Sequence, residues 1–167
     1  MKSSSSKYLA WPDYKQGWIF RHKDLPIDDE VRSQIKPLTE SASHQFWSSH
    51  ISREATHASH FLGDDWPARN GVWGEKGNWQ TLWDSDDNAL PELLAEHIDW
   101  QDNNVMHFCY DSGHVVETTW GVFKAHWKNF LFFDDSPLLL GKKRQQVAQF
   151  ESDGSYRIGL KPINKSN

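Results

Sequence analysis

One segment limits the possible folds more than any other part of the chain: VETTWGVFKAHWKNFLFFDDSPLLL, Val116 to Leu140, holds two Trp and four Phe. Large apolar side chains recur there at the helical spacing i, i+3, i+7, i+10 and i+11, namely Trp120, Phe123, Trp127, Phe130 and Leu131. A stripe of this kind is typical of a buried helix face rather than of a cofactor site. The sequence therefore predicts an amphipathic helix with its aromatic side in the core, opposite Lys124, Lys128 and Asn129.

The length of 167 residues predicts one domain with one core. Only 37% of the residues are hydrophobic, but 10 Trp, 9 Phe and 4 Tyr can fill a core with few side chains, because each buried ring removes about 150–250 Å² from water. We expect the domain to span residues 14–162, between a flexible, Ser-rich N-terminal tail at 1–13 and a flexible C-terminus at 163–167.

Charge and hydropathy argue against several classes of partner. The net charge is −5 and the longest basic run is Lys142-Lys143-Arg144, so the chain lacks the positive footprint that nucleic acid requires. No apolar stretch reaches the ~18–20 residues of a membrane helix, and the first residues do not resemble a signal peptide. The single cysteine, Cys109, cannot form a disulfide within the chain, which is typical of a cytoplasmic protein. We expect no membrane contact and a monomer or weak homodimer.

Three further segments show helical signals. The first begins at Asp24 or Pro26 and ends at Pro37, with one apolar face of Ile27, Val31 and Ile35. The second follows Thr39, a suitable N-cap, and carries Phe46, Trp47, His50 and Ile51 at spacings of three and four. The third is LPELLAEHIDW at residues 90–100, with Pro91 at an early helical position.

Strand signals are short and separated by turns. GWIFRH at 17–22 is interpreted as a strand, and NVMHFCYD at 104–111 is expected to pair with VVETTW at 115–120. QQVAQFESDGSYRIGL at 145–160 predicts a second hairpin that turns at residues 152–154. Alternation in the strand at 104–111 favours Met106, Phe108 and Tyr110 as the core face over Val105, His107 and Cys109. The expected fold is α+β, with a small, mainly antiparallel sheet and three or four helices packed on it.

The segment Gly63–Asp87 contains four Trp but no regular apolar period. It is interpreted as a long ordered loop with one short strand at Trp79–Trp83. Two interpretations stay open, because the rings can either cover the sheet as a lid or form a binding surface, where Trp is enriched. The candidate binding residues are Trp73, Trp79, Trp83, Asp84 and Asp86.

Motifs for catalysis or metal binding are weak. Asp84, Asp86 and Asn88 match the start of a calcium loop, but alanine stands at its sixth and twelfth positions, where glycine and a bidentate glutamate are needed. His57 and His60 lack an HExxH motif, so no metal and no cofactor is expected. Cys109 is interpreted as an inert buried thiol. The remaining catalytic possibility is a hydrolase or transferase site built from His107, Glu117, Asp134 and Asp135.

The chain also resembles a known family. The segments that carry the resemblance are KQGWIFRHKDLPIDD, IKPLTE and ETTWGVFKAHWKNFLFFDDSPLLLGKKRQQVAQFESDGSYRIGL. Together they are similar to a gammaproteobacterial domain-of-unknown-function family, numbered 2947, across most of residues 14–160. The resemblance implies a bacterial cytoplasmic protein and provides no site residues.

No motif in the sequence assigns a function, so the hypotheses for function rest on the chemistry of the expected surface. The favoured hypothesis is a non-enzymatic binding or regulatory module whose partner, a protein or a small molecule, meets an acidic surface that bears Trp side chains. One alternative is the small hydrolase or transferase. Another is an immunity-type protein that neutralises a basic toxin by charge complementarity.

Overall fold

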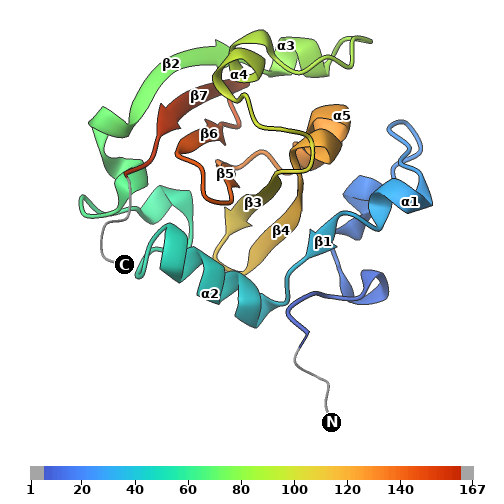
Figure 1. Cartoon of the computed structure of the whole chain (residues 1–167), viewed down its shortest axis with the longest axis horizontal. Coiled ribbons are helices and arrows are strands. Elements are labelled where there is room, and N and C mark those ends of the chain that lie inside the picture. The colour runs from blue at the N-terminus through green and yellow to red at the C-terminus, as the bar shows by residue number, and fades with distance from the viewer. Residues whose placement is uncertain (1–5, 163–167) are drawn as a thin grey trace.

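The sheet that organises the domain is antiparallel and has seven strands in the order β1-β4-β3-β5-β6-β7-β2 (Figure 1). The computed structural model of the chain describes residues 6–162. Within them the strands are β1 (Lys36–Pro37), β2 (Trp73–Asn78), β3 (Val105–Asp111), β4 (His114–Thr119), β5 (Leu138–Gly141), β6 (Gln146–Phe150) and β7 (Ser155–Leu160).

Five α-helices join these strands in the described part of the chain: α1 (Asp29–Arg32), α2 (Glu40–His50), α3 (Gln80–Trp83), α4 (Glu92–His97) and α5 (Trp120–Phe130). Short 3-10 turns are η1 (Trp11–Asp13), η2 (Gly17–Phe20), η3 (Ala58–His60), η4 (Trp66–Ala68) and η5 (Asn70–Val72). The α+β class and the antiparallel sheet are confirmed. The sheet is larger than the small one expected, and the α-helices number five rather than three or four.

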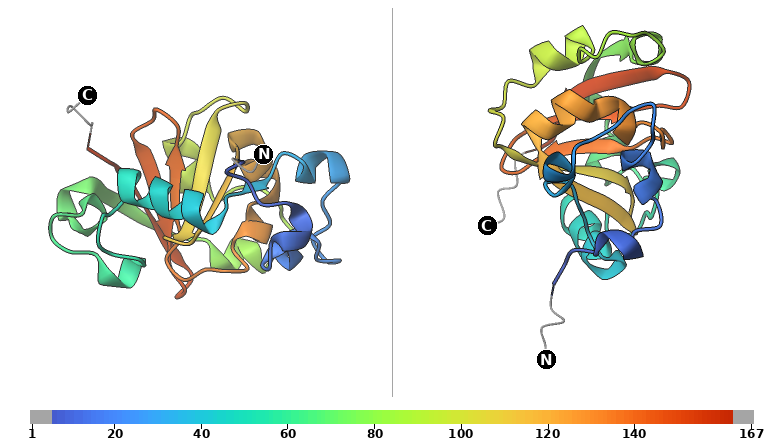
Figure 2. Two further views of the ribbon diagram at one scale, coloured as in Figure 1. Left: turned by 90° about the horizontal axis from the view of Figure 1, so that it is seen from below. Right: turned by 90° about the vertical axis from the view of Figure 1, so that its right-hand side faces the viewer.

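Both faces of the sheet are covered, which divides the core into two layers. On one face α5, α4 and the N-terminal 3-10 turns pack with Met106, Phe108 and Ala148. On the other face α2 and the segment that reaches β2 pack with Cys109, Leu140 and Val147. Figure 2 shows α2 and α5 on opposite sides of the strands. The central strands are therefore buried on both sides, and they lack the in-and-out alternation of a half-exposed sheet.

Helix α5 confirms the aromatic stripe. Its N-cap, Thr119, accepts a hydrogen bond from the backbone N–H of Val122, and the predicted apolar residues are buried: Trp120, Phe123, Trp127, Phe130 and Leu131. The predicted polar side is wrong at Lys128 and Asn129, which are also buried. The backbone leaves helical geometry at His126 (φ −134°, ψ 26°), so the exposed side of the first turns does not continue to Lys128 and Asn129.

Asn129 is buried because the N-terminal segment wraps over this side of α5. Its side-chain amide donates to the backbone oxygens of Ile19 and Leu25, at 2.9 Å each. These bonds satisfy carbonyl groups that have no strand partner. A polar side chain thus ties two chain segments more than one hundred residues apart.

Both expected hairpins are confirmed by the pairings of β3 with β4 and of β6 with β7. Met106, Phe108 and Tyr110 face the α5 layer as expected, while Cys109 packs in the α2 layer. Helix α2 also begins where predicted, since the Thr39 side chain accepts from the backbone N–H of Ala42. In each of these elements the turn or cap residues and the apolar pattern indicate the same structure, which is why the sequence predicted them correctly.

Three assignments near the N-terminus differ from the structure. The segment 17–22 is not a strand, because residues 17–20 form η2, with Ile19 and Phe20 fully buried. The helix expected from residue 24 or 26 to Pro37 shrinks to α1, and Lys36–Pro37 pairs with β4 instead. Part of the tail expected at residues 1–13 is attached to the domain, since Tyr8 forms a β-bridge with Leu38. Residues 1–5 of that tail and the expected flexible C-terminus at 163–167 lie outside the described residues.

The segment Gly63–Asp87 is not a long loop. It forms two 3-10 turns, then edge strand β2 against β7, and then the short helix α3 in place of the strand expected at Trp79–Trp83. Strand β2 has the sequence WGEKGN, which is poor in strand-forming residues, and its pairing has a bulge between Trp73 and Lys76. Tertiary pairing with β7, rather than local propensity, therefore defines this strand.

Candidate functional site

The three Trp side chains proposed for binding do not form one open surface, because Trp73 packs in the α2 layer whereas Trp79 and Trp83 pack in the α5 layer. Each indole N–H donates to a different backbone oxygen: Trp73 to Pro67 (2.9 Å), Trp79 to Glu151 (3.0 Å) and Trp83 to Lys128 (2.8 Å). Trp79 is only 3% exposed, whereas Trp73 and Trp83 are half-buried. The guanidinium of Arg157 also covers the ring of Trp73, at 4.1 Å from its centroid. The rings of Trp73 and Trp79 thus attach the segment to the sheet.

Trp83, by contrast, belongs to a group of rings at the surface. Its ring meets Phe132 at 5.5 Å between centroids, and Phe132 also meets Trp18 at 5.4 Å and His22 at 5.0 Å. Trp18 meets Phe133 at 5.5 Å and is 44% exposed, while the other four rings are half-buried. We call these five residues the aromatic patch.

Acidic side chains follow three members of this patch along the chain. Asp24 lies 3.8 Å from His22, Asp84, Asp86 and Asp87 come directly after Trp83, and Asp134 and Asp135 come directly after Phe133. All six are exposed except Asp134, which is half-buried. We call them the acidic rim. Two basic side chains, Arg21 and Lys23, are also exposed beside His22, so acidic residues outnumber basic ones next to the patch residues along the chain.

The acidic rim contains one close pair of like charges. Burial, together with the charge of Asp135, raises the pKa of Asp134 above its usual value. Both effects disfavour the negative charge of Asp134 in the isolated protein. A cation placed next to the two carboxylates would relieve this repulsion.

Hydrogen bonds to α5 hold the Trp83 side of the patch in place. The backbone oxygen of Lys128 accepts from the Trp83 indole, and Lys128 Nζ donates to the backbone oxygen of Ser85 at 2.9 Å. The Trp127 indole donates to the backbone oxygen of Asn88 at 3.4 Å. The right-hand view of Figure 2 shows this segment, in yellow-green, above α5 with the blue N-terminal turns beside it. The patch is therefore fixed before any partner binds.

Trp18, Phe132 and Phe133 were not predicted from the sequence as site residues. One signal was present for the two phenylalanines, because they follow the last stripe residue and stand where a continued helix would place its next turn. Large apolar residues directly after a helix and before Asp-Asp are exposed more readily than those within the stripe. Trp18 offered no such signal, since a GWIF run has the same appearance in a strand or in a buried turn.

Of the four residues of the catalytic alternative, the structure brings only His107 and Glu117 together. His107 and Glu117 are direct cross-strand partners on β3 and β4, with 3.1 Å between Nε2 and the carboxylate Oε1. The second carboxylate oxygen accepts from the Tyr8 hydroxyl at 2.9 Å, and Lys7 Nζ lies 3.9 Å from Oε1. Hydrogen bonds from His107 and Tyr8 outweigh burial and lower the pKa of Glu117 to about 2. Burial, together with the hydrogen bond to Glu117 and the negative charge of that carboxylate, raises the pKa of Tyr8 to about 12.

This polar cluster is closed rather than open to a substrate. Phe46 covers the imidazole of His107 at 4.1 Å between ring centroids, and the residue is 8% exposed. Cys109, two residues along β3, is fully buried, and burial raises the pKa of its thiol far above the usual range. A nucleophile needs an accessible, activated group beside its base, and this thiol does not provide one.

Asp134 and Asp135 lie away from that cluster. They precede β5, whose first residue, Leu138, pairs with Cys109, and the side chain of Asp135 lies 3.2 Å from His57 Nε2. The four residues of the catalytic alternative are thus divided between the middle of the β3–β4 pair and the loop before β5.

Glu117 should make the stability of the fold sensitive to acid. Folding lowers the pKa of Glu117 from 4.5 to about 2. The carboxylate therefore stabilises the fold at pH values above the unfolded pKa of 4.5, and this stabilisation is lost as the pH falls through the folded pKa of about 2. We expect the free energy of unfolding to fall by about 2 kcal/mol more in the wild type than in Glu117→Gln between about pH 5 and pH 2. Urea melts at each pH measure this, with exposed Glu75→Gln as the control. Equal pH dependence in the wild type and Glu117→Gln would contradict it.

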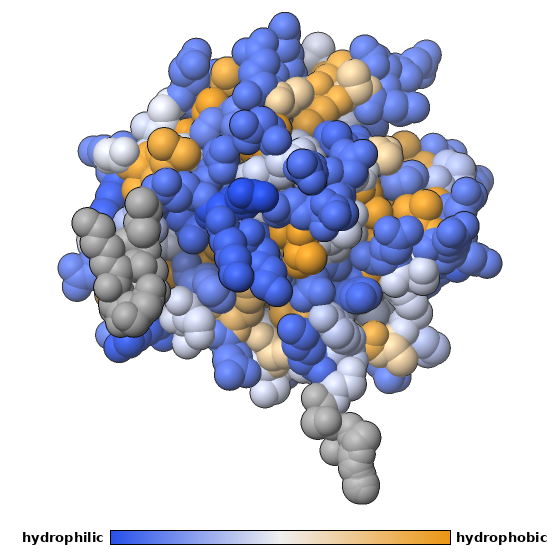
Figure 3. Space-filling model, in the orientation of Figure 1, coloured by the Kyte–Doolittle hydropathy of each residue, from blue (hydrophilic) through white to orange (hydrophobic). Residues whose placement is uncertain are grey.

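Other site types find little support in residues 6–162. No group of three or more His, Cys, Asp or Glu side chains is placed there to hold a metal ion. Within the same residues, no helix combines the length and the apolar character needed to cross a membrane. The face shown in Figure 3 is mostly hydrophilic, with its apolar residues in small separate groups.

The fold defines the class of protein as an α+β domain built on one antiparallel sheet with both faces covered. The family model described as "Protein of unknown function (DUF2947)" matches residues 8–159, and the chain belongs to this family. The resemblance found in the sequence is therefore confirmed. Comparison with curated proteins and with solved structures gave no match.

Proposed function

We propose that this protein is a non-enzymatic binding module that uses the aromatic patch to hold a partner protein. The observation that carries the proposal is the 44% exposure of Trp18 in a group of contacting rings. Burying a large ring of this kind against a partner supplies much of the energy of a binding hot spot, and Trp is the residue most enriched there. An exposed aromatic group with a polar rim is typical of a protein interaction site.

The partner's contact segment carries basic residues next to an apolar one. The acidic rim favours arginine or lysine, and the net charge of −5 favours the approach of a basic protein over an acidic one. A basic toxin would have this chemistry, so the immunity-type role is one form of the same proposal. The hydrolase or transferase alternative has weaker support, because His107 is enclosed and the thiol of Cys109 is buried.

A synthetic peptide pair tests the proposal without a known partner. The probe is a fluorescein-labelled hexapeptide of alternating arginine and phenylalanine, and its counterpart carries glutamate in place of arginine. We expect the basic peptide to bind and Trp18→Ala to weaken binding by about tenfold or more, because the largest exposed ring is removed. Fluorescence anisotropy at several salt concentrations measures both affinity and its electrostatic part.

The matched control is Leu160→Ala, which removes another large exposed side chain, 53% exposed, on β7. It should leave peptide affinity unchanged. Trp18→Ala itself should cost less than about 1 kcal/mol of stability, because a surface ring has few contacts to lose. The proposal fails if the acidic peptide binds as well as the basic one, or if Trp18→Ala and wild type bind equally.

A further inference from the structure

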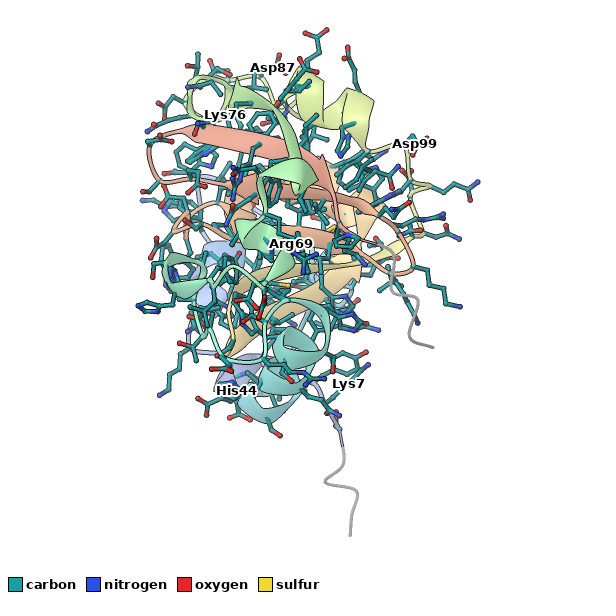
Figure 4. The ribbon with its side chains drawn as sticks, turned by 90° about the vertical axis from the view of Figure 1, so that its left-hand side faces the viewer. Lys7, His44, Arg69, Lys76, Asp87 and Asp99 are labelled. Carbon is teal, nitrogen blue, oxygen red and sulfur yellow. The ribbon has the colours of Figure 1, made fainter. Side chains whose placement is uncertain are left out.

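A cavity of about 520 Å³ lies at the C-terminal end of α2, away from the aromatic patch. Its walls come from three parts of the chain: residues 48–54, residues 62–69 and the start of the C-terminal segment at Lys161 and Pro162. In Figure 4 Arg69, one of the lining residues, is labelled in the green segment above α2. The volume is within the range of about 300–1,000 Å³ that is usual for small-molecule sites.

The walls of this cavity are held by hydrogen bonds. The Trp66 indole donates to the backbone oxygen of His50 at 2.8 Å, which joins the second wall to the end of α2. The backbone N–H groups of Ile51 and Ser52 both donate to the oxygen of Trp47, and the Ser52 hydroxyl accepts from the N–H of Ala55. A ligand would therefore enter a site that is already formed, which lowers the entropic cost of binding.

Three basic side chains on the cavity lining, Lys161, Arg53 and Arg69, form no ion pair with a carboxylate of the described residues. Lys161 is half-buried, and burial lowers the pKa of its ammonium group. His50 lines the same cavity as Lys161, and burial together with the charge of Lys161 lowers the pKa of His50. Arg53 and Arg69 are exposed on the same lining.

The remaining lining residues limit the size and the charge of a ligand. Glu54, Asp64 and Asp65 also line the cavity, and they would repel a large polyanion. Asp65 already accepts a hydrogen bond from the backbone N–H of Leu62 at 3.0 Å, while Ser48 and Ser49 present hydroxyl groups. A fitting molecule has one anionic end and, at its other end, groups that donate hydrogen bonds to carboxylates.

From these features we infer that the cavity binds a small organic anion with one carboxylate or phosphate group and several hydroxyl groups. The anionic group lies beside Lys161 and His50, which both line the cavity, and it accepts a charge-assisted hydrogen bond from the Lys161 ammonium group. Hydroxyl groups donate to Glu54 and Asp64, and the half-buried indole of Trp66 offers an apolar contact. This site is separate from the aromatic patch, so the two proposals stand or fall independently.

Three six-carbon probes that each carry several hydroxyl groups test the inference: gluconate, glucose 6-phosphate and neutral glucose. Titration with each, followed by amide NMR shifts and isothermal calorimetry, should show binding of at least one anionic probe and none of glucose. The two anions distinguish a carboxylate site from a phosphate site. Shifts should be concentrated in residues 48–54, in residues 62–69 and at Lys161.

The decisive variant is Lys161→Gln, which removes the charge but keeps most of the side chain. It should weaken binding of the anionic probe by about fivefold or more, because a charge-assisted hydrogen bond is lost. Lys143→Gln, an exposed lysine on the β5–β6 turn, is the matched control and should change nothing. The inference is overturned if neither anion binds, if glucose binds as well as the anions, or if Lys161→Gln and Lys143→Gln have the same effect.

Discussion

Trp127→Ala is expected to lower the free energy of unfolding by about 3–5 kcal/mol, the cost usual for removing a large aromatic side chain from a core. Trp127 is 1% exposed and packs in the larger of the two core layers, on the last full turns of α5. Its indole also donates to Asn88, so the substitution leaves a cavity and removes one attachment of the segment that follows Trp83. Because the surrounding sheet is rigid on both sides, the cavity can collapse only in part.

Urea denaturation followed by circular dichroism measures this change. Trp127→Phe serves as a second variant, since it keeps most of the apolar volume and should be clearly less destabilising than the alanine variant. It also gives a folded reference if Trp127→Ala does not fold. A loss below about 1 kcal/mol for Trp127→Ala would mean that the aromatic side of α5 does not form the core.

The sequence predicted elements in which two local signals agree. For α2, the apolar spacing and the Thr39 cap both favour the same helix, and for β3 and β4 the turn at residues 111–114 lies between two strand-like segments. His107 and Glu117 were proposed only as titratable members of the catalytic alternative, and the structure makes them direct partners across this hairpin. Asp134 and Asp135 could not be placed, because strand β5, which follows them, was not anticipated.

Elements defined by distant contacts could not be predicted. Strand β2 exists because β7 offers it hydrogen bonds, and its own sequence contains two glycines and no β-branched residue. The run at residues 17–20 is apolar over only four residues, too short to distinguish a strand from a buried 3-10 turn. The aromatic patch combines residues from three separate parts of the chain, so no local pattern could have identified it.

Trp79→Ala is expected to cost about 3 kcal/mol, which assigns this residue to the core rather than to a binding surface. Trp79 is 3% exposed, its indole donates to the backbone oxygen of Glu151, and its backbone N–H donates to the oxygen of Gly154 at 2.8 Å. Both bonds end on the β6–β7 turn, so the ring couples the segment after β2 to the neighbouring hairpin.

Two comparison variants separate packing from hydrogen bonding at this position. Trp79→Phe keeps an aromatic ring but removes the bond to Glu151, so it should cost about 1–2 kcal/mol. Trp18→Ala removes the same kind of side chain from the surface and should cost less than about 1 kcal/mol. Equal losses in Trp79→Ala and Trp18→Ala, measured by urea melts, would contradict the distinction between the two rings. If both losses were below about 1 kcal/mol, Trp79 would return to the set of binding candidates, because a Trp that can be removed without loss of stability has no structural reason to be there.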